Sequence, residues 1–262
     1  MSLSRRRSLT LLPALAGLAT SARAQPVPAG DDDDPPMRLK LVVLDIGGTL
    51  IADHGEVPDA MLGALARRGI IVTPQDFSAW RGASKREMVR HFVARDRKDA
   101  SLIEPIYADF TATALKTYEK VQPIPGAQQA MQELAAMKLL LATTTGFDRV
   151  LTTAILSRLG WQHYFAASIS SDDVSEGRPA PYMLFRAMEA ARVNDVREVM
   201  AVGDTPLDLQ AADNAGLGVA IGVYSGAATE DRLRKERNSG VLPSVAELPD
   251  LIRRGLPMSH CR

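Results

Sequence analysis

Two segments of the sequence place carboxylates where they could bind a cation or attack a substrate. The stretch LVVLDIGGTL, residues 41–50, runs four apolar residues into Asp45. The stretch AVGDTPLDL, residues 201–209, runs into Asp204 and places Asp208 four residues later. Converging carboxylates repel one another unless they hold a cation, and ligand sets made only of oxygen suit Mg²⁺. Because Mg²⁺ usually keeps waters and takes phosphate oxygens, these segments predict a phosphate or phosphonate substrate.

Two further segments could serve an anion. In TTTGF, Thr144, Thr145 and Gly146 offer hydroxyl and backbone donors to an oxyanion. In DDVSEGRPAP, Arg178 lies in a loop before a predicted helix, where it can neutralise phosphate charge. One aspartate at a strand end is often a helix cap, and a lone arginine is often a surface residue. Capping does not explain four such groups at successive strand ends, which favours a functional site.

The elements that position these groups follow from the hydrophobic pattern. Apolar runs typical of buried parallel strands lie at residues 39–44, 139–143, 165–169, 199–202 and 218–223. Amphipathic stretches such as APYMLFRAMEAARV, with helical spacing, separate the later runs. This alternation predicts an α/β fold, a doubly wound Rossmann-like parallel sheet. Ligands of such sheets bind outside the carboxyl ends of the strands, where the four groups lie.

The segment after the first strand has a different pattern. Between residues 50 and 121 no comparable apolar run occurs, and helical patterns lie at residues 58–68, 84–96 and 101–120. This predicts an α-helical cap inserted after strand one, at the ligand-binding edge of the sheet. The predicted boundaries are a core of residues 37–52 and 122–262 and a cap of residues 53–121.

The N-terminal residues resemble an export signal. Residues 1–24 combine a basic start with a short apolar run and an Ala-x-Ala site, and Asp-rich, Pro-rich residues 25–36 favour a disordered linker. The three arginines at 5–7 resemble a twin-arginine signal, which predicts a periplasmic protein. The apolar run is too short for a permanent span, so no stable membrane anchor is expected. Alternatively, Met37 is the true start and the protein is cytoplasmic.

Composition excludes some classes of site. Acidic and basic residues balance at 31 each, so the protein has no overall positive electrostatic field that would favour nucleic-acid binding. The single cysteine, Cys261, excludes an intramolecular disulfide and a cysteine-rich metal site.

A lysine in the predicted cap has the features of a nucleophile. Ser84 and Glu87 form a capping-box pattern, so a helix should begin there. Lys85 then shares the apolar face of this helix with Met88, Val89 and Phe92. Burial, together with the nearby Arg81 and Arg86, would lower the pKa of the Lys85 amine and free it as a nucleophile. The alternative is a stem along the cap surface with its ammonium in water.

The order of the motifs is similar to that of the haloacid dehalogenase superfamily. The matching residues are D-x-x-G-T-L from Asp45, Thr144, Arg178, and G-D-x-x-x-D with Asp204 and Asp208. The resemblance implies that Asp45 is the nucleophile that forms an aspartyl-phosphate. It implies that Asp45, the carbonyl of Gly47, Asp204 and Asp208 hold Mg²⁺. It also implies that Gly48, Gly82, Thr145 and Gly146 bind the substrate.

Gly47 narrows the resemblance to one subgroup. Phosphatases of the superfamily have an aspartic acid two residues after the nucleophile, and Gly47 lacks its acid–base chemistry. The phosphonoacetaldehyde hydrolases have a small residue there, and TTTGF, DDVSEGRPAPYM, VGDTPLDL and RGASKREM resemble that subgroup. The last of these implies that Lys85 forms a Schiff base. Met88 and Arg81 replace the subgroup's histidine and methionine, so the pocket differs.

These features predict an Mg²⁺-dependent hydrolase. It would cleave the C–P bond of phosphonoacetaldehyde or a related phosphonate through an aspartyl-phosphate and a lysine Schiff base. One alternative is a phosphatase for a small phosphate monoester, in which Lys85 is dispensable. Another is a phosphate- or phosphonate-binding protein with negligible turnover. Caps of this superfamily pair in some members, so a homodimer through the cap is a further expectation.

Overall fold

The computed structural model describes residues 39–255. They belong to one compact unit, residues 37–262. The predicted export signal and linker, residues 1–24 and 25–36, lie outside the described residues. Within residues 39–255, no helix has the length and apolar composition needed to cross a membrane.

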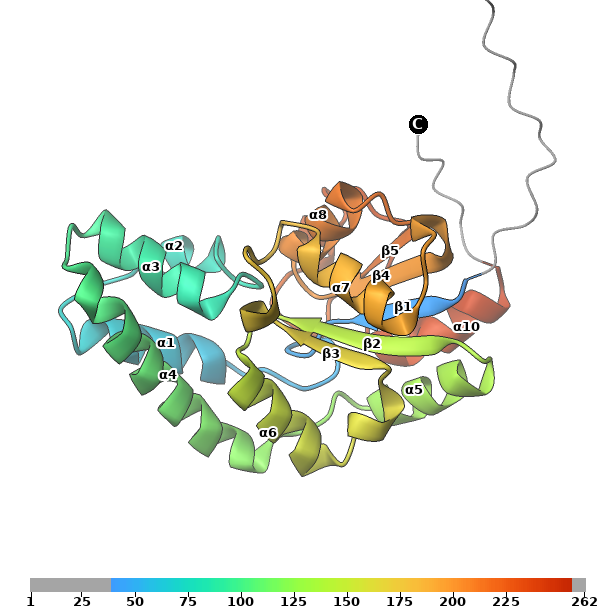
Figure 1. The fold of residues 1–262 in the computed structure, drawn as a ribbon, viewed down its shortest axis with the longest axis horizontal. Helices are drawn as coiled ribbons and strands as arrows, with labels where there is room; N and C mark the ends of the chain where they lie inside the picture. The colour runs from blue at the N-terminus through green and yellow to red at the C-terminus, as the bar shows by residue number, and fades with distance from the viewer. Residues whose placement is uncertain (1–38, 256–262) are drawn as a thin grey trace, which may run out of the picture. The chain divides into compact units, whose positions relative to one another are not determined.

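A six-stranded sheet, parallel throughout, forms the centre of the fold and confirms the predicted doubly wound architecture (Figure 1). Its strands are β1 (Leu41–Leu44), β2 (Leu140–Thr145), β3 (Ala167–Ser170), β4 (Val199–Gly203), β5 (Val219–Val223) and β6 (Gly240–Leu242). They are ordered β3-β2-β1-β4-β5-β6. The sequence did not predict β6, because its three half-buried residues form no continuous apolar run.

Helices cover both faces of the sheet. Helices α7 (Tyr182–Ala191) and α8 (Pro206–Asn214) lie on one face, and α5 (Ala127–Ala136), α6 (Arg149–Leu159) and α10 (Leu248–Arg253) lie on the other (Figure 1). The short helix α9 (Glu230–Leu233) packs near β5. Because both faces of the central strands are buried, apolar residues run through them without polar alternation.

Four helices lie between β1 and β2 in the chain: α1 (Glu56–Ala66), α2 (Pro74–Ser78), α3 (Lys85–Arg95) and α4 (Ile103–Thr117). Helices α1 and α3 pack on α4, and their apolar side chains join the same buried cluster as β1. The two connections to the sheet run side by side, since the N–H of Ala52 donates to the carbonyl of Gln122 at 2.9 Å. Only α2 was not predicted, because five residues are too few to show helical periodicity.

The strand order places β1 beside β4 at the point where the winding of the sheet reverses. Leu44 at the end of β1 is in register with Val202 on β4. The next residue, Asp45, donates its N–H to the carbonyl of Val202 at 2.9 Å. Crevices at such reversal points are the usual ligand sites of open α/β sheets.

Candidate active site

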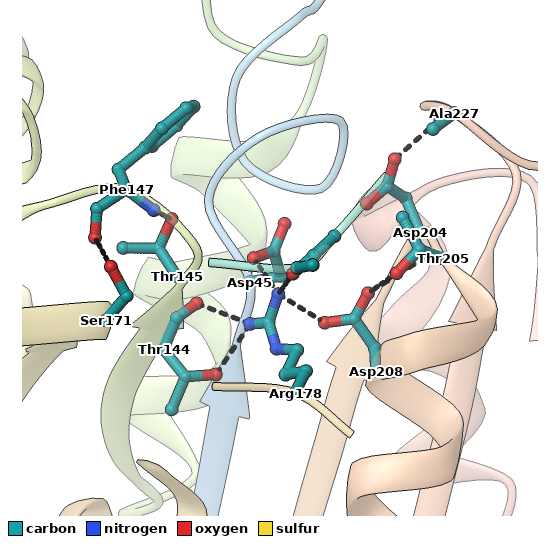
Figure 2. Close-up of polar contacts among 12 residues, drawn as sticks. Asp45, Thr144, Thr145, Phe147, Ser171, Arg178, Asp204, Thr205, Asp208 and Ala227 are labelled. Carbon is teal, nitrogen blue, oxygen red and sulfur yellow. Dashed lines mark hydrogen bonds and ion pairs between the residues drawn. The ribbon is translucent and has the colours of Figure 1, made fainter. Parts of the chain in front are cut away.

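Asp45 and Asp204 follow the ends of the adjacent strands β1 and β4, and both are buried. One carboxylate oxygen of Asp204 accepts from the N–H of Ala227 at 2.6 Å (Figure 2). Gly48 packs directly on this carboxylate, since a Cβ there would lie 2.2 Å from the Asp204 Oδ2. Gly48 also has a φ of +77°, which favours glycine. The second glycine of the motif therefore lets Asp204 fit beside the β1 turn.

Arg178 lies at the centre of the buried polar network (Figure 2). Its Nη1 is 2.9 Å from the Asp45 Oδ1 and 2.8 Å from the Asp208 Oδ1. Its Nη2 donates to the Thr144 carbonyl at 2.8 Å and to the Thr144 hydroxyl at 2.9 Å. The planar guanidinium thus ties the end of β1 to the end of β2 and the start of α8.

Asp208 has both carboxylate oxygens engaged. Oδ1 pairs with Arg178, and Oδ2 accepts from the N–H and the hydroxyl of Thr205, at 3.0 and 2.6 Å. This carboxylate therefore caps α8 and orients Arg178 at once. The helix-capping role that the sequence left open for Asp208 is thus present, and the same carboxylate contacts Arg178.

Burial dominates the electrostatics of the carboxylates. It raises the pKa of Asp45 to about 6, an effect that Arg178 opposes and Asp208 reinforces. The pKa of Asp204 is raised well above its usual range by burial and by the negative charges of Asp45 and Asp208. The charged forms of Asp45 and Asp204 are therefore disfavoured, and a cation bound between them would favour those forms.

The arrangement fits Mg²⁺ in part. Within residues 39–255, no three His, Cys, Asp or Glu side chains have their ligand atoms grouped around one point, because Arg178 lies between Asp45 and Asp208. Asp204, however, is buried and forms no ion pair within these described residues. Mg²⁺ is commonly bound by one or two carboxylates together with waters and substrate oxygens. Asp45, Asp204 and the Gly47 carbonyl supply such a set, whereas the two oxygens of Asp208 have other partners.

Lys85 is the first residue of α3, and only 6% of it is exposed. Its Nζ donates to the Ala83 carbonyl at 3.1 Å and lies 5.4 Å from the centroid of the Phe147 ring. Burial lowers the pKa of this amine from 10.5 to about 8, although the carboxylate of Asp45 opposes the effect. The solvent-exposed alternative for Lys85 is therefore not what the structure shows.

The cationic neighbours of this amine differ from the prediction. Arg178, and not Arg81 or Arg86, is the cation that lowers the pKa of Lys85 most. Arg86 pairs with Glu104 and lies over the Tyr107 ring, 4.2 Å from its centroid. A helix turns by about 100° per residue, so the residue after Lys85 points to a different side of α3.

The predicted capping box is only half formed. The Ser84 hydroxyl accepts from the N–H of Glu87 at 3.4 Å, as expected at a helix start. The Glu87 carboxylate, however, accepts from the N–H of Gly177 at 2.8 Å instead of from Ser84. This bond joins the cap helix α3 to the loop that carries Arg178.

Two glycines let the cap loop dock on the core. A Cβ at Gly82 would lie 2.3 Å from the Thr205 hydroxyl oxygen, and its φ is +88°. A Cβ at Gly146 would lie 2.3 Å from the Ala83 carbonyl. The carbonyl of Gly146 also accepts from the N–H of Lys85 at 3.1 Å. The close backbone approach thus fixes the start of α3 over the ends of β2 and β4.

A cavity with an empty volume of about 480 Å³ lies where the cap loop meets the sheet. The predicted site residues that line it are Asp45, Gly47, Gly82, Lys85, Thr145, Gly146, Arg178 and Asp204. Gly48, Thr144 and Asp208 lie behind this lining, where they support Asp204 and Arg178. The structure therefore brings all the predicted site residues to one place, in two layers.

Sequence reasoning missed Phe147. A Cβ at Gly47 would lie 3.5 Å from the edge of the Phe147 ring. The same ring meets Tyr118 edge to face and lies near the amine of Lys85. An apolar residue shows no chemistry by its type, and its place directly after TTTG was the only available signal.

Comparison with known proteins agrees with this geometry. The haloacid dehalogenase-like hydrolase model matches residues 39–216. The chain is 25% identical over 256 residues to a phosphonoacetaldehyde hydrolase of Bacteroides fragilis, covering 82% of this chain and 96% of the relative. It is 28% identical over 190 residues to a phosphoglycolate phosphatase of Agrobacterium fabrum, covering 71% and 81%.

A longer relative and a solved structure extend the comparison. The chain is 27% identical over 198 residues to a bifunctional phosphonoacetaldehyde hydrolase/aminoethylphosphonate transaminase of Clostridioides difficile, and this match spans 69% of the chain but only 31% of the relative. The crystal structure of a phosphonoacetaldehyde hydrolase-like protein from Oleispira antarctica superposes with a TM-score of 0.70 at 21% identity, covering 83% and 95% of the two chains. The family model, the strand order and the converging motifs agree, and the chain belongs to the haloacid dehalogenase-like hydrolases.

Proposed function

We propose that this hydrolase cleaves the C–P bond of phosphonoacetaldehyde, or of a related phosphonate, through an aspartyl-phosphate and an imine of Lys85. One observation carries the proposal. The buried amine of Lys85 and the carboxylate of Asp45 line the same cavity, in which Gly47 provides no acid. The relatives named phosphonoacetaldehyde hydrolase support this assignment at low identity.

The chemistry explains why an amine would replace an acid. Direct cleavage of a C–P bond leaves its electron pair on carbon, and a carboxylic acid near a leaving oxygen does little for a carbanion. An imine two bonds from phosphorus accepts that electron pair and becomes an enamine. A lysine with a lowered pKa is suited to form the imine, because its neutral amine is the nucleophile.

The bonds balance over one turnover. The Lys85 amine adds to the aldehyde carbon and water leaves, which gives the imine. An Asp45 oxygen attacks phosphorus, the C–P bond breaks, and its electrons form the enamine. Protonation and addition of water release acetaldehyde and the free amine. A second water hydrolyses the aspartyl-phosphate, so the net reaction consumes one water and yields acetaldehyde and phosphate.

Other residues position these groups. Arg178 holds Asp45 at 2.9 Å and places positive charge next to the phosphoryl site, while Thr144 fixes the guanidinium. Preorganised charge of this kind acts strongly where water is excluded. The Ala83 carbonyl orients the Lys85 amine, and the Phe147 ring shields it. Asp45, Asp204 and the Gly47 carbonyl would hold Mg²⁺, which supplies further positive charge to the phosphoryl oxygens.

A phosphatase for a small phosphate monoester is the second candidate. The phosphoglycolate phosphatase relative favours it, and the network of Asp45, Arg178 and Asp204 would serve a phosphate ester equally well. Such an enzyme needs no Lys85. It would also lack the acid that contributes roughly 10²–10⁴ in rate. A third candidate, a phosphonate-binding protein, would bind without turnover.

The test supplies phosphonoacetaldehyde and Mg²⁺ to the full chain and measures acetaldehyde and phosphate. Borohydride added during turnover should reduce the imine and attach the two-carbon adduct to Lys85, as read by peptide mass spectrometry. Lys85→Ala should lose both acetaldehyde release and trapping. Lys40→Ala, a control at an exposed lysine paired with Glu198, should keep both. Phosphate-ester hydrolysis that survives in Lys85→Ala, without any acetaldehyde from wild type, would favour the phosphatase.

A further inference from the structure

Arg81 lines the catalytic cavity, yet the reaction proposed above gives it no task. It lies in the cap loop before α3, and 28% of its side chain is exposed. Its Nη2 pairs with the Asp53 Oδ2 at 2.9 Å. Asp53 lies in the connection from β1 to the cap and also lines the cavity. A cation and its partner carboxylate therefore lie beside the reaction site.

The ion pair leaves most of the guanidinium free. A guanidinium has five N–H donors in a planar fork, and Asp53 is the one hydrogen-bond acceptor that the described residues give Arg81. The other oxygen of Asp53 accepts from the N–H of Gly55 at 3.0 Å. Asp53 is thus held by the backbone at the start of α1 as well as by Arg81. It anchors one edge of the guanidinium and leaves donors for an incoming anion.

Arg81 also lines a second pocket. Together with Thr205 and Ala227, it lines both the catalytic cavity and a second cleft with an empty volume of about 1210 Å³, open solvent included. Two residues after Arg81, the Ala83 carbonyl binds the Lys85 amine. Among the described residues, Lys85, Arg178 and Arg81 are the cations that line the cavity, so a substrate with its carbonyl carbon at Lys85 and its phosphonate at Arg178 leaves Arg81 to bind a further group.

We propose that Arg81 binds a carboxylate carried on the carbonyl carbon of the substrate, so that the preferred substrate is a 3-phosphono-2-oxo acid, 3-phosphonopyruvate. The inference rests on the proposed C–P cleavage and names its substrate class. A planar guanidinium matches a carboxylate through two parallel N–H bonds. An aldehyde substrate has only hydrogen at that position and would leave the cation without a role.

3-Phosphonopyruvate would react by the same steps as phosphonoacetaldehyde, with a carboxylate in place of hydrogen on the carbonyl carbon. The Lys85 amine and the keto carbon form an imine with loss of water. Asp45 takes the phosphoryl group, and the C–P electrons form an enamine that carries the carboxylate. Protonation and hydrolysis give pyruvate and the free amine, and water releases phosphate from Asp45. The net reaction consumes one water and needs no other reactant.

The first test is binding without turnover. Calorimetry with Mg²⁺ present compares 3-phosphonopropanoate with propylphosphonate, which replaces the carboxylate by a methyl group. We expect wild type to prefer the carboxylate by about 10–100-fold, the range of a charge-assisted hydrogen-bonding pair. Arg81→Met should abolish this preference. Arg86→Met, a control at the cap arginine that pairs with Glu104 outside the cavity, should retain it. Equal binding of the two compounds to wild type would overturn the proposal.

The second test separates this proposal from the one it rests on. Pyruvate and phosphate are measured from 3-phosphonopyruvate, and acetaldehyde and phosphate from phosphonoacetaldehyde. We expect a higher kcat/KM for the keto acid in wild type, and Arg81→Met should reverse the order mainly through KM. Turnover of the aldehyde alone would sink the carboxylate proposal and leave C–P cleavage intact. If neither compound is cleaved but wild type still prefers 3-phosphonopropanoate through Arg81, the carboxylate site stands and the lysine mechanism fails.

Discussion

The Nζ of Lys85 lies 5.4 Å from the centroid of the Phe147 ring, and this ring also covers the space in front of Gly47. The ring acts on the amine in two opposite ways. As a π-system it attracts an ammonium by about 0.5–2 kcal/mol. As an apolar wall it contributes to the burial of the amine, and that burial as a whole lowers the pKa of Lys85 from 10.5 to about 8, roughly 3 kcal/mol against the ammonium. The exclusion of water by the whole site therefore outweighs the attraction of the ammonium to this ring.

Phe147→Ala tests this balance. Loss of the ring should admit water and raise the pKa of Lys85, so the pH at which kcat/KM levels off should rise above about 8. At pH 7 roughly a tenth of the amine is neutral at a pKa of 8, and this fraction should fall several-fold. The measurement is a pH–rate profile of acetaldehyde release. Phe147→Leu keeps an apolar side chain and should keep the pH–rate profile of wild type. An unchanged pH–rate profile in Phe147→Ala would contradict the role of this ring in shielding the Lys85 amine from water.

Gly47→Asp should move the enzyme towards ester hydrolysis. The new carboxyl group begins beside the Phe147 ring, at van der Waals distance, and can protonate a leaving oxygen. General acid help should raise hydrolysis of an alkyl phosphate such as phosphoglycolate by about 10²-fold or more. Gly47→Ala adds the Cβ without the acid and should give no such rise. Equal rates for the two variants would show that position 47 does not control the reaction.

Lys85→Met should make the protein more stable at neutral pH. The folded pKa of Lys85 is below its unfolded value, so the ammonium destabilises the fold fully below pH 8. This cost declines as pH rises from 8 to 10.5, where the amine loses its proton in the unfolded chain too. The gain in free energy of unfolding, on the order of 3 kcal/mol, corresponds to a Tm several degrees higher. Thermal unfolding at pH 7 and pH 10 should show the difference shrinking at the higher pH.

Arg178→Met should destabilise the fold strongly, because it leaves Asp45 and Asp208 buried without their cation. Removal of one partner from a buried ion pair costs about 3–5 kcal/mol. Arg178→Lys keeps the charge but cannot contact Asp45, Asp208 and Thr144 with one planar group. It should restore most of the stability and only part of kcat, as measured by denaturant unfolding and phosphate release. An unchanged kcat in Arg178→Lys would show that catalysis does not need the planar geometry of the guanidinium.

The sequence predicted the strands and the site well where one physical signal dominated. Apolar runs located the five strands β1 to β5, and the shared edge of a parallel sheet brought Asp45, Thr144, Arg178 and Asp204 together. Contacts between the cap and the core escaped it, because no local pattern shows that Glu87 binds Gly177 and not Ser84. The pairing of Arg81 with Asp53, 28 residues away in the chain, was hidden for the same reason. The short elements α2 and β6 carry too few residues for periodicity.

Gly82 bears on how this pocket could change in evolution. Any larger residue there would set a Cβ 2.3 Å from the Thr205 hydroxyl oxygen, so the cap loop could not stay seated on the core. Water would then reach Lys85, and in the proposed reaction hydrolysis of the imine would compete with cleavage of the carbon–phosphorus bond. Arg81 and Met88 also line the cavity, and we expect substrate preference to vary at such positions instead. Gly82 keeps the cap loop in contact with the core, and the residues around it set which substrate the closed cavity accepts.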